Sequence, residues 1–166
     1  KNEKNYKLHI IYIIGFSPKF GYLKGNDSIK RAAKVWKNKN GEDVAVWRED
    51  WGNQLGDQYI KYNENVVFEV WRPDIRADKI YTHIYENGLI NKSFPINKGI
   101  FFSGMRPIRD IYSIAMEKEL SKIISNNVKP IILLPAVRKK ITTRILNLFN
   151  NDKIINTHFL NCSMFI

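Results

Sequence analysis

Along the chain, continuous apolar runs alternate with segments in which apolar residues recur at helical spacing. Residues 8–14 (LHIIYII) are almost entirely apolar and rich in β-branched side chains, which predicts a strand buried on both faces. Residues 28–40 place apolar side chains on one stripe and basic side chains on the other face, which predicts an amphipathic helix that ends at Asn40-Gly41. Residues 43–48 (DVAVWR) predict a second strand, so the chain is expected to open with a βαβ unit.

The rest of the chain continues this alternation. Strands are expected at residues 66–71, 99–103, 129–135 and 153–159, and helices at residues 107–125 and 137–150. Two segments, residues 49–65 and 76–95, lack a clear periodicity and receive no assignment. Because strands alternate with helices, we expect a single α/β domain, residues 1–166. Its sheet should be open, mostly parallel and Rossmann-like, with helices on both faces.

Composition narrows the choice of compartment and partner. The single cysteine, Cys162, cannot form an internal disulfide, so a reducing compartment and a cytoplasmic protein are expected. The longest apolar run extends only from Ile10 to Phe16, whereas a membrane span needs about 20 residues. The net charge of +11 indicates either a lysine-coated surface or an anionic partner. The basic helix expected at residues 28–40, which includes Trp36, adds an anionic membrane surface as a candidate partner, at the inner face of the membrane.

Candidate ligand-binding residues follow the carboxyl ends of the expected strands, where open parallel sheets bind their ligands. In the segment 15–27, Gly21 and Gly25 allow a ligand to approach the backbone closely, and Lys24 adds positive charge before the start of a helix. Arg138 follows another expected strand and is a second candidate for binding an anion. The sequence contains neither the dinucleotide-binding glycine pattern nor a P-loop.

The three histidines receive different interpretations. His9 lies inside the first expected strand and is interpreted as structural, whereas the role of His83 stays open. His158 lies at the carboxyl end of the last expected strand, where an imidazole can act as a general base or bind a hydroxyl group. No pair of histidines has metal-ligand spacing and no Asp-x-Asp motif occurs, so no metal is expected.

The order of these segments resembles the N-terminal domain of GT-B glycosyltransferases, in particular the retaining, nucleotide-sugar-dependent group called family 4. Residues 9–47 (HIIYIIGFSPKFGYLKGNDSIKRAAKVWKNKNGEDVAVW) are similar to the opening of that domain. Residues 68–95 (FEVWRPDIRADKIYTHIYENGLINKSFP) resemble a segment of some microbial members. The stretch KPIILLPAVRKK, followed by DKIINTHF, is similar to the paired late strands, the second of which ends in histidine.

This resemblance implies a two-domain enzyme, of which the chain is the N-terminal, acceptor-side domain. The missing C-terminal domain would bind the nucleotide, and the ligands would be a nucleotide-sugar donor and a hydroxyl acceptor, with no cofactor or metal. The family's glycine loop corresponds to Gly21, Tyr22 and Gly25, although Tyr22 stands where many members have glycine. The acceptor-side histidine corresponds to His158. The glutamate pair of the C-terminal domain is absent from the sequence, so we expect no transferase activity from this chain alone.

Two other classes of function stay open. A non-enzymatic Rossmann-like module would bind a nucleotide or a phosphorylated metabolite at the same edge of the sheet. A basic nucleic-acid-binding domain would use the net charge of +11 and would present a contiguous cationic face. The glycosyltransferase interpretation, by contrast, expects no nucleic acid as a partner.

Overall fold

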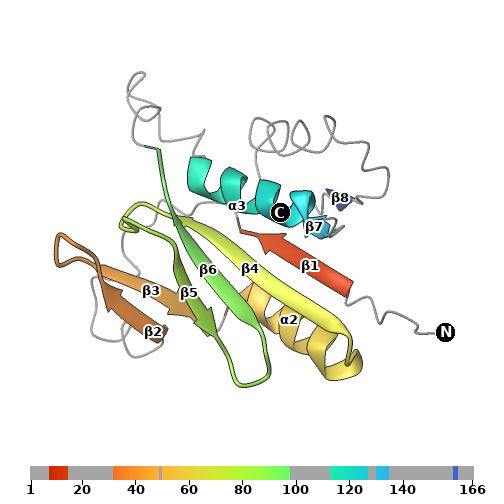
Figure 1. Ribbon diagram of the computed structural model, residues 1–166. Coiled ribbons are helices and arrows are strands. Elements are labelled where there is room, and N and C mark those ends of the chain that lie inside the picture. The colour runs from red at the N-terminus through yellow and green to blue at the C-terminus, as the bar shows by residue number, and fades with distance from the viewer. Residues whose placement is uncertain are drawn as a thin grey trace, which may run out of the picture.

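The structure, a computed structural model, describes residues 8–14, 32–48, 50–97, 113–126 and 130–134, and the backbone of residues 159–160. These residues form a six-stranded sheet, a separate two-stranded ribbon and two helices (Figure 1). The sheet and the helices enclose the apolar core, and the ribbon packs beside them.

The six-stranded sheet is mostly parallel. Its strands are β1 (Leu8–Ile13), β4 (Val66–Asp74), β5 (Tyr81–Ile84), β6 (Ile90–Pro95), β7 (Ile131–Leu133) and β8 (Phe159–Leu160). Their order across the sheet is β5-β6-β4-β1-β7-β8, and every neighbouring pair except β5 and β6 is parallel. The chain therefore extends the sheet to one side of β1 through β4 and β6, and then returns to the other side with β7 and β8. The prediction of an α/β protein with an open, mostly parallel sheet is confirmed.

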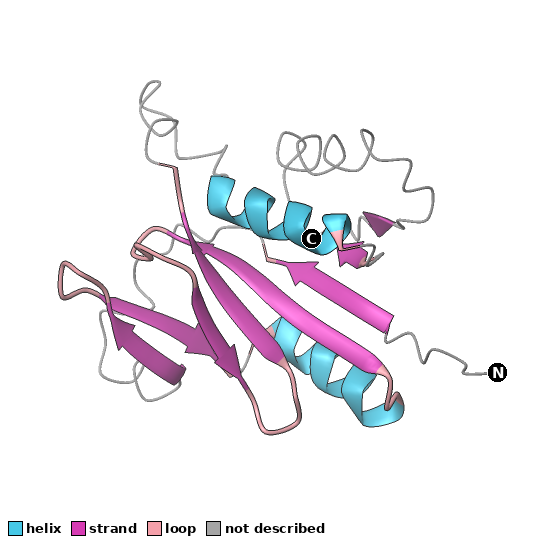
Figure 2. Cartoon of the chain, in the orientation of Figure 1, coloured by secondary structure: helices cyan, strands magenta, loops and turns pink. Residues whose placement is uncertain are grey.

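Helices α2 (Trp51–Tyr62) and α3 (Ile114–Ser125) cover opposite faces of the sheet (Figure 2). Successive side chains of a strand point to opposite faces, and β1 uses both directions. Ile11 belongs to the apolar cluster that contains Met116 of α3, whereas Ile10 belongs to the cluster on the α2 side, against which Leu55 packs. The continuous apolar run at residues 8–14 thus forms a strand that is buried on both faces, as predicted.

Two glycines allow α2 to lie directly against the sheet. A Cβ atom on Gly52 would lie 2.8 Å from Cδ1 of Tyr12, and a Cβ atom on Gly56 would lie 2.7 Å from Cδ1 of Phe68. Real Cβ atoms essentially never approach a neighbour so closely, so only glycine fits at these positions without a shift of the sheet side chains. Because glycine and asparagine occupy much of the sheet-facing side, the apolar periodicity of residues 49–65 is weak, and the sequence alone does not predict this helix.

The prediction of a helix at residues 28–40 is wrong where the structure describes this segment. Strand β2 (Ala32–Lys37) pairs antiparallel with β3 (Asp43–Trp47), and the two form the ribbon. The Asn40-Gly41 pair, expected to end a helix, lies in the turn of the ribbon, where Gly41 has a φ of 75°. Asn-Gly is also a strong hairpin signal, and this second role prevails here. Since β3 does not join the main sheet, the expected βαβ unit at the start of the chain is not formed.

Contacts with distant residues hold the ribbon in place. The side-chain oxygen of Asn38 accepts hydrogen bonds from the backbone N–H groups of Asn40 and Glu42, and its amide donates to the carbonyl of Arg76 at 2.6 Å. Trp36 packs against Tyr81 of β5, with ring centroids 5.4 Å apart. These tertiary contacts override the helical spacing. They also remove the basis for a membrane-surface helix, because Trp36 lies in a strand and packs against the protein.

Several other predicted elements are found with different bounds. The strands expected at residues 66–71 and 129–135 correspond to β4 and β7. The helix expected at residues 107–125 corresponds to α3, which begins at Ile114 in the described part of the chain. The unassigned residues 76–95 contain both β5 and β6.

Two further predictions, a strand at residues 99–103 and a helix at residues 137–150, lie outside the described residues. The last strand was expected at residues 153–159, and its described part is Phe159–Leu160. Among the helices that the structure describes, none combines the length and the apolar character needed to cross a membrane.

We expect Gly56→Ala to lower the free energy of unfolding by about 1–3 kcal/mol, because the added methyl group overpacks the buried Phe68 ring and the end of Leu89. Urea unfolding followed by circular dichroism measures the change. Gln58→Ala, on the exposed side of the same helix, is the matched control and should stay within about 0.5 kcal/mol of the wild type. A Gly56→Ala protein as stable as the wild type would contradict the close approach of α2 to the sheet.

Candidate functional site

The order of the parallel strands creates a topological switch point between β1 and β7. After β1 the chain proceeds to β4 on one side, whereas after β7 it proceeds to β8 on the other side. In open α/β sheets, ligands bind outside the carboxyl ends of the strands at such a point. Ile14 and Leu134 follow the last residues of β1 and β7 and mark this place in the described structure. We call this side of the sheet the carboxyl edge and treat it as the candidate site.

Most of the net positive charge of the sequence belongs to the three segments that follow β1, β6 and β7. The part of the chain with described side chains contains eleven lysines and arginines and eleven aspartates and glutamates, so it has no net charge. The segments 15–31, 98–112 and 135–158 follow β1, β6 and β7 in the chain, and together they contain twelve basic and three acidic residues. Charge of this sign favours an anionic ligand at the carboxyl edge.

The connections at the opposite, amino edge of the sheet have a different charge. The segments 1–7, 63–65, 85–89 and 126–130 precede β1, β4, β6 and β7, and together they contain four basic and three acidic residues. Among the connections, the three that follow β1, β6 and β7 therefore contain most of the excess positive charge of the sequence.

At the carboxyl edge, the N-terminus of α2 is already occupied by the side chain of Asp50. This carboxylate accepts a hydrogen bond from the backbone N–H of Gly52 at 2.9 Å. It also forms an ion pair with Arg72 of β4, with 2.5 Å between Oδ2 and Nη2. An acidic residue at this position satisfies a free N–H group and interacts favourably with the helix dipole. Because a carboxylate takes the place that a phosphate would need, α2 does not offer its N-terminus to an anionic ligand.

The N-terminus of α3 is closed in a similar way. Ser113 accepts a hydrogen bond from the backbone N–H of Met116 at 3.1 Å and donates its hydroxyl to the carbonyl of Pro95 at 2.5 Å. The side-chain oxygen of Asn97 accepts from the backbone N–H of Ile114 at 2.8 Å. At both described helix starts, side chains of the protein thus accept hydrogen bonds from N-terminal backbone N–H groups. These capping contacts favour other groups as the ones that hold an anion at the carboxyl edge.

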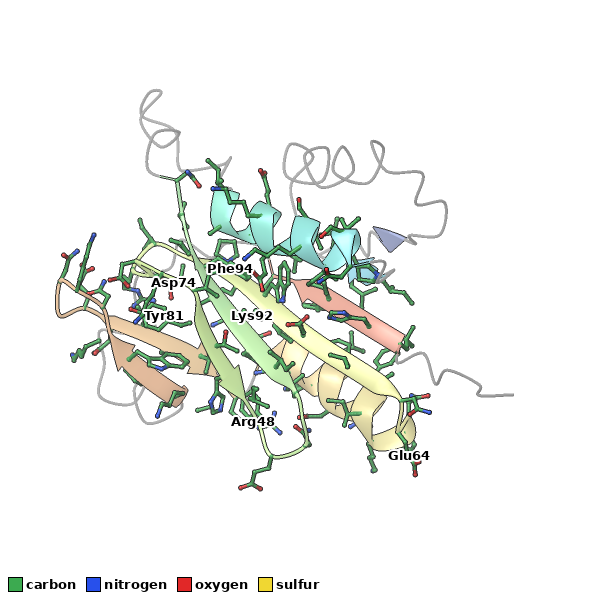
Figure 3. The ribbon with its side chains drawn as sticks, in the orientation of Figure 1. Arg48, Glu64, Asp74, Tyr81, Lys92 and Phe94 are labelled. Carbon is green, nitrogen blue, oxygen red and sulfur yellow. The ribbon has the colours of Figure 1, made fainter. Side chains whose placement is uncertain are left out.

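A separate cluster of charges lies between the sheet and α3. The side chain of Glu69 on β4 is only 4% exposed and is hydrogen-bonded to His9 of β1. Its other oxygen lies 3.1 Å from Nζ of Lys92 on β6, which is labelled in Figure 3 and also reaches Glu119 of α3 at 3.3 Å. These contacts join three strands to α3. They agree with the interpretation of His9 as a structural residue.

The charge state of Glu69 depends on two opposing effects. Burial in the apolar interior raises the pKa of Glu69, because the charged form loses its hydration. The hydrogen bond with His9 and the positive charge of Lys92 favour the charged form and outweigh burial, so the net pKa lies below the ordinary value of 4.5. Glu69 is therefore ionised at neutral pH, which suits a residue that connects elements of the fold.

His83 lies on β5 among aromatic rings. Its ring centroid is 4.5 Å from that of Tyr85 and 6.5 Å from that of Trp36. Burial lowers the pKa of His83, and the charge of Lys34 lowers it further, so the imidazole is neutral at pH 7. Arg48, which follows β3, stacks on Tyr85 at 4.8 Å from the ring centroid. These contacts attach the ribbon to β5, so the structure gives His83 a packing role.

The site residues predicted from the sequence lie outside the described residues. They are Gly21, Tyr22, Lys24 and Gly25 of the loop after β1, Arg138 after β7, and His158 before β8. Their roles stay predictions. The same holds for the place of His158 in the strand expected at residues 153–159, of which the structure describes only Phe159.

The predictions from the sequence did not include the residues at the described start of α2 at the carboxyl edge. These are Asp50, Trp51 and Arg72, the ion-pair partner of Asp50. An aspartate directly before a helix is an N-cap signal and could have marked Asp50. This N-cap signal was not used, because no helix was predicted after Asp50.

The chain matches no family model, no curated protein and no solved structure. Among the residues that the structure describes, no group of three or more His, Cys, Asp or Glu side chains could hold a metal ion. The strand order and the distribution of charge are therefore the observations that bear on function.

We expect Glu69→Gln to lower the free energy of unfolding at pH 7 by about 3 kcal/mol, because Lys92 loses a buried ionised partner. Since the pKa of Glu69 is lowered in the folded state, its charge stabilises the fold above the unfolded value of 4.5. This stabilisation is lost as the pH falls through the lowered pKa. The variant should therefore lose less stability than the wild type on acidification below pH 4.5, which urea unfolding at several pH values measures.

Glu64→Gln is the matched control, because Glu64 lies exposed in the turn between α2 and β4 (Figure 3). Its stability should change by less than about 0.5 kcal/mol. An acid dependence of Glu69→Gln that equals the wild-type dependence would show that the fold does not lower the pKa of Glu69.

Proposed function

We propose that this chain is the Rossmann-like, acceptor-side domain of a nucleotide-sugar-dependent glycosyltransferase. The reaction of the complete enzyme is the transfer of a sugar from a nucleotide sugar to a hydroxyl group of the acceptor. The observation that carries the proposal is the concentration of positive charge in the segments after β1, β6 and β7. These segments leave the edge at which an open parallel sheet binds its ligand, and the diphosphate of a nucleotide sugar is the anion that they would receive.

The chemistry of the proposal is positioning and charge stabilisation. Lys24 and Arg138 offset the negative charge that develops on the departing diphosphate, and Gly21 and Gly25 allow backbone N–H groups to approach it. In α2 and α3, side chains of the protein already accept hydrogen bonds from N-terminal backbone N–H groups. This supports the assignment, because the diphosphate is then bound by residues outside these two helices. His158 binds the acceptor hydroxyl or removes its proton. Tyr22 adds a further contact within the glycine loop.

The proposal predicts a particular order of binding affinities. We expect at least one of UDP-glucose, GDP-mannose and ADP-glucose to bind more tightly than its own nucleoside diphosphate and than glucose 1-phosphate, because both the diphosphate and the sugar are bound. Isothermal titration calorimetry on the full 166-residue chain measures these affinities. Lys24→Ala and Arg138→Ala should each weaken the binding by about tenfold, the loss expected for one charged hydrogen bond.

Lys61→Ala is the matched control, because Lys61 is exposed in the last turn of α2, at the amino edge. Its affinity should equal that of the wild type. Glucose 1-phosphate as the tightest ligand would contradict the glycosyltransferase assignment in favour of a phosphorylated-metabolite module. Tight binding of a single-stranded DNA oligonucleotide with steep salt dependence, and no binding of nucleotide sugars, would contradict it in favour of a nucleic-acid-binding domain.

A further inference from the structure

Trp51 is the most exposed large apolar side chain among the described residues. Its exposed fraction is 74%, although tryptophan is a residue type that proteins usually keep largely buried. The neighbouring positions on the same side of α2, Gln54 and Gln58, are polar. The fold therefore does not need an indole at this position, and leaving it in water forgoes the free energy that its burial would contribute.

Trp51 stands at the carboxyl edge, next to the switch point. It is the first residue of α2, and the following residue, Gly52, packs on the ring of Tyr12 near the end of β1. Side chains in a helix lean towards its N-terminus, so the indole of the first residue extends beyond the helix towards the carboxyl edge. The same helix has a second exposed aromatic residue, Tyr62, at its other end, the amino edge.

The surroundings of Trp51 favour an uncharged ligand group. Asp50 and Arg72 neutralise each other beside it, and the Asp50 carboxylate already accepts the N–H of Gly52. A phosphate would meet this carboxylate at close range and would be repelled. A flat aromatic face beside balanced polar groups suits a ring with an apolar face and hydroxyl groups, which is the chemistry of a sugar.

We propose that Trp51 is a sugar-binding residue, on whose indole face a pyranose ring of the ligand stacks. The inference rests on the proposed function and makes it more specific, because it separates two kinds of recognition at the carboxyl edge. The start of α2 binds a sugar ring, and the diphosphate is left to groups outside this helix.

Saturation-transfer NMR tests the inference, because it reports which ligand protons touch the protein. The probes are UDP-glucose, GDP-mannose and the methyl glycosides of glucose, galactose, mannose and N-acetylglucosamine, each added to the full chain. We expect signals from sugar-ring protons with the wild type and an apparent affinity about fivefold weaker with Trp51→Ala, as for the loss of one aromatic contact. Trp51→Phe should restore most of the affinity, since it keeps an aromatic face.

Tyr62→Ala is the matched control, because Tyr62 lies on the same helix with an exposed fraction of 72%. It should bind every probe as the wild type does. Trp51→Ala should also keep the wild-type circular dichroism spectrum and stability, since the ring it removes is exposed.

The outcomes separate the inference from the proposed function. Sugar-ring signals that are equal in Trp51→Ala and the wild type overturn the inference and leave the proposed function in place. A loss confined to the base protons of the nucleotide sugars overturns it in favour of base stacking. If the wild type binds none of the probes, the proposed function fails, and the inference fails with it.

Discussion

The central strand β1 buries apolar side chains on both of its faces, and the arrangement of the other elements follows from this requirement. Ile11 faces the α3 side and Ile10 faces the α2 side, so each face needs a covering layer. A helix that covers a parallel strand runs back from its carboxyl end, which places the starts of both α2 and α3 at one edge. The glycines at the α2 contact allow this layer to lie close to the sheet. The edge that gathers these helix starts is the one at which β1, β6 and β7 end, before the segments rich in basic residues begin.

In the described part of the chain, polar groups between the sheet and α3 and at both helix starts are paired within the protein. The buried ion pairs around Glu69 connect β1, β4 and β6 to α3 under the helix. At the carboxyl edge, Asp50 and Ser113 close the two helix starts. Among the described residues at this edge, Trp51 exposes the largest apolar side chain. The proposed division of recognition assigns the sugar ring to this residue and the diphosphate to groups outside α2.

The sequence predicts the central strands because they are continuous apolar runs, as at residues 8–14 and 66–71, but it does not assign β5 and β6, which lack such runs. It fails at residues 28–40, where helical spacing and strand pairing compete. Trp36 packs against Tyr81, and the side-chain amide of Asn38 donates a hydrogen bond to the carbonyl of Arg76. Both partners are far away in the sequence, so the spacing of residues 28–40 does not reveal them. The prediction from the sequence also misses α2. The close contact with the sheet requires glycine at buried positions of this helix, so these positions do not show the apolar spacing of an amphipathic helix. The sequence located the candidate site at the carboxyl ends of the strands. It did not indicate Trp51, because the helix that begins at this residue was not predicted.

The equal numbers of acidic and basic side chains in the described framework have a consequence for how this protein can vary. The described ion pairs that join strands and helices use side chains of this framework itself. Substitutions of exposed charges on the framework that lie outside these ion pairs, such as Lys61, can change the electrostatic attraction to a partner while the folding equilibrium stays nearly constant. Two such proteins could therefore differ widely in isoelectric point and still melt at similar temperatures.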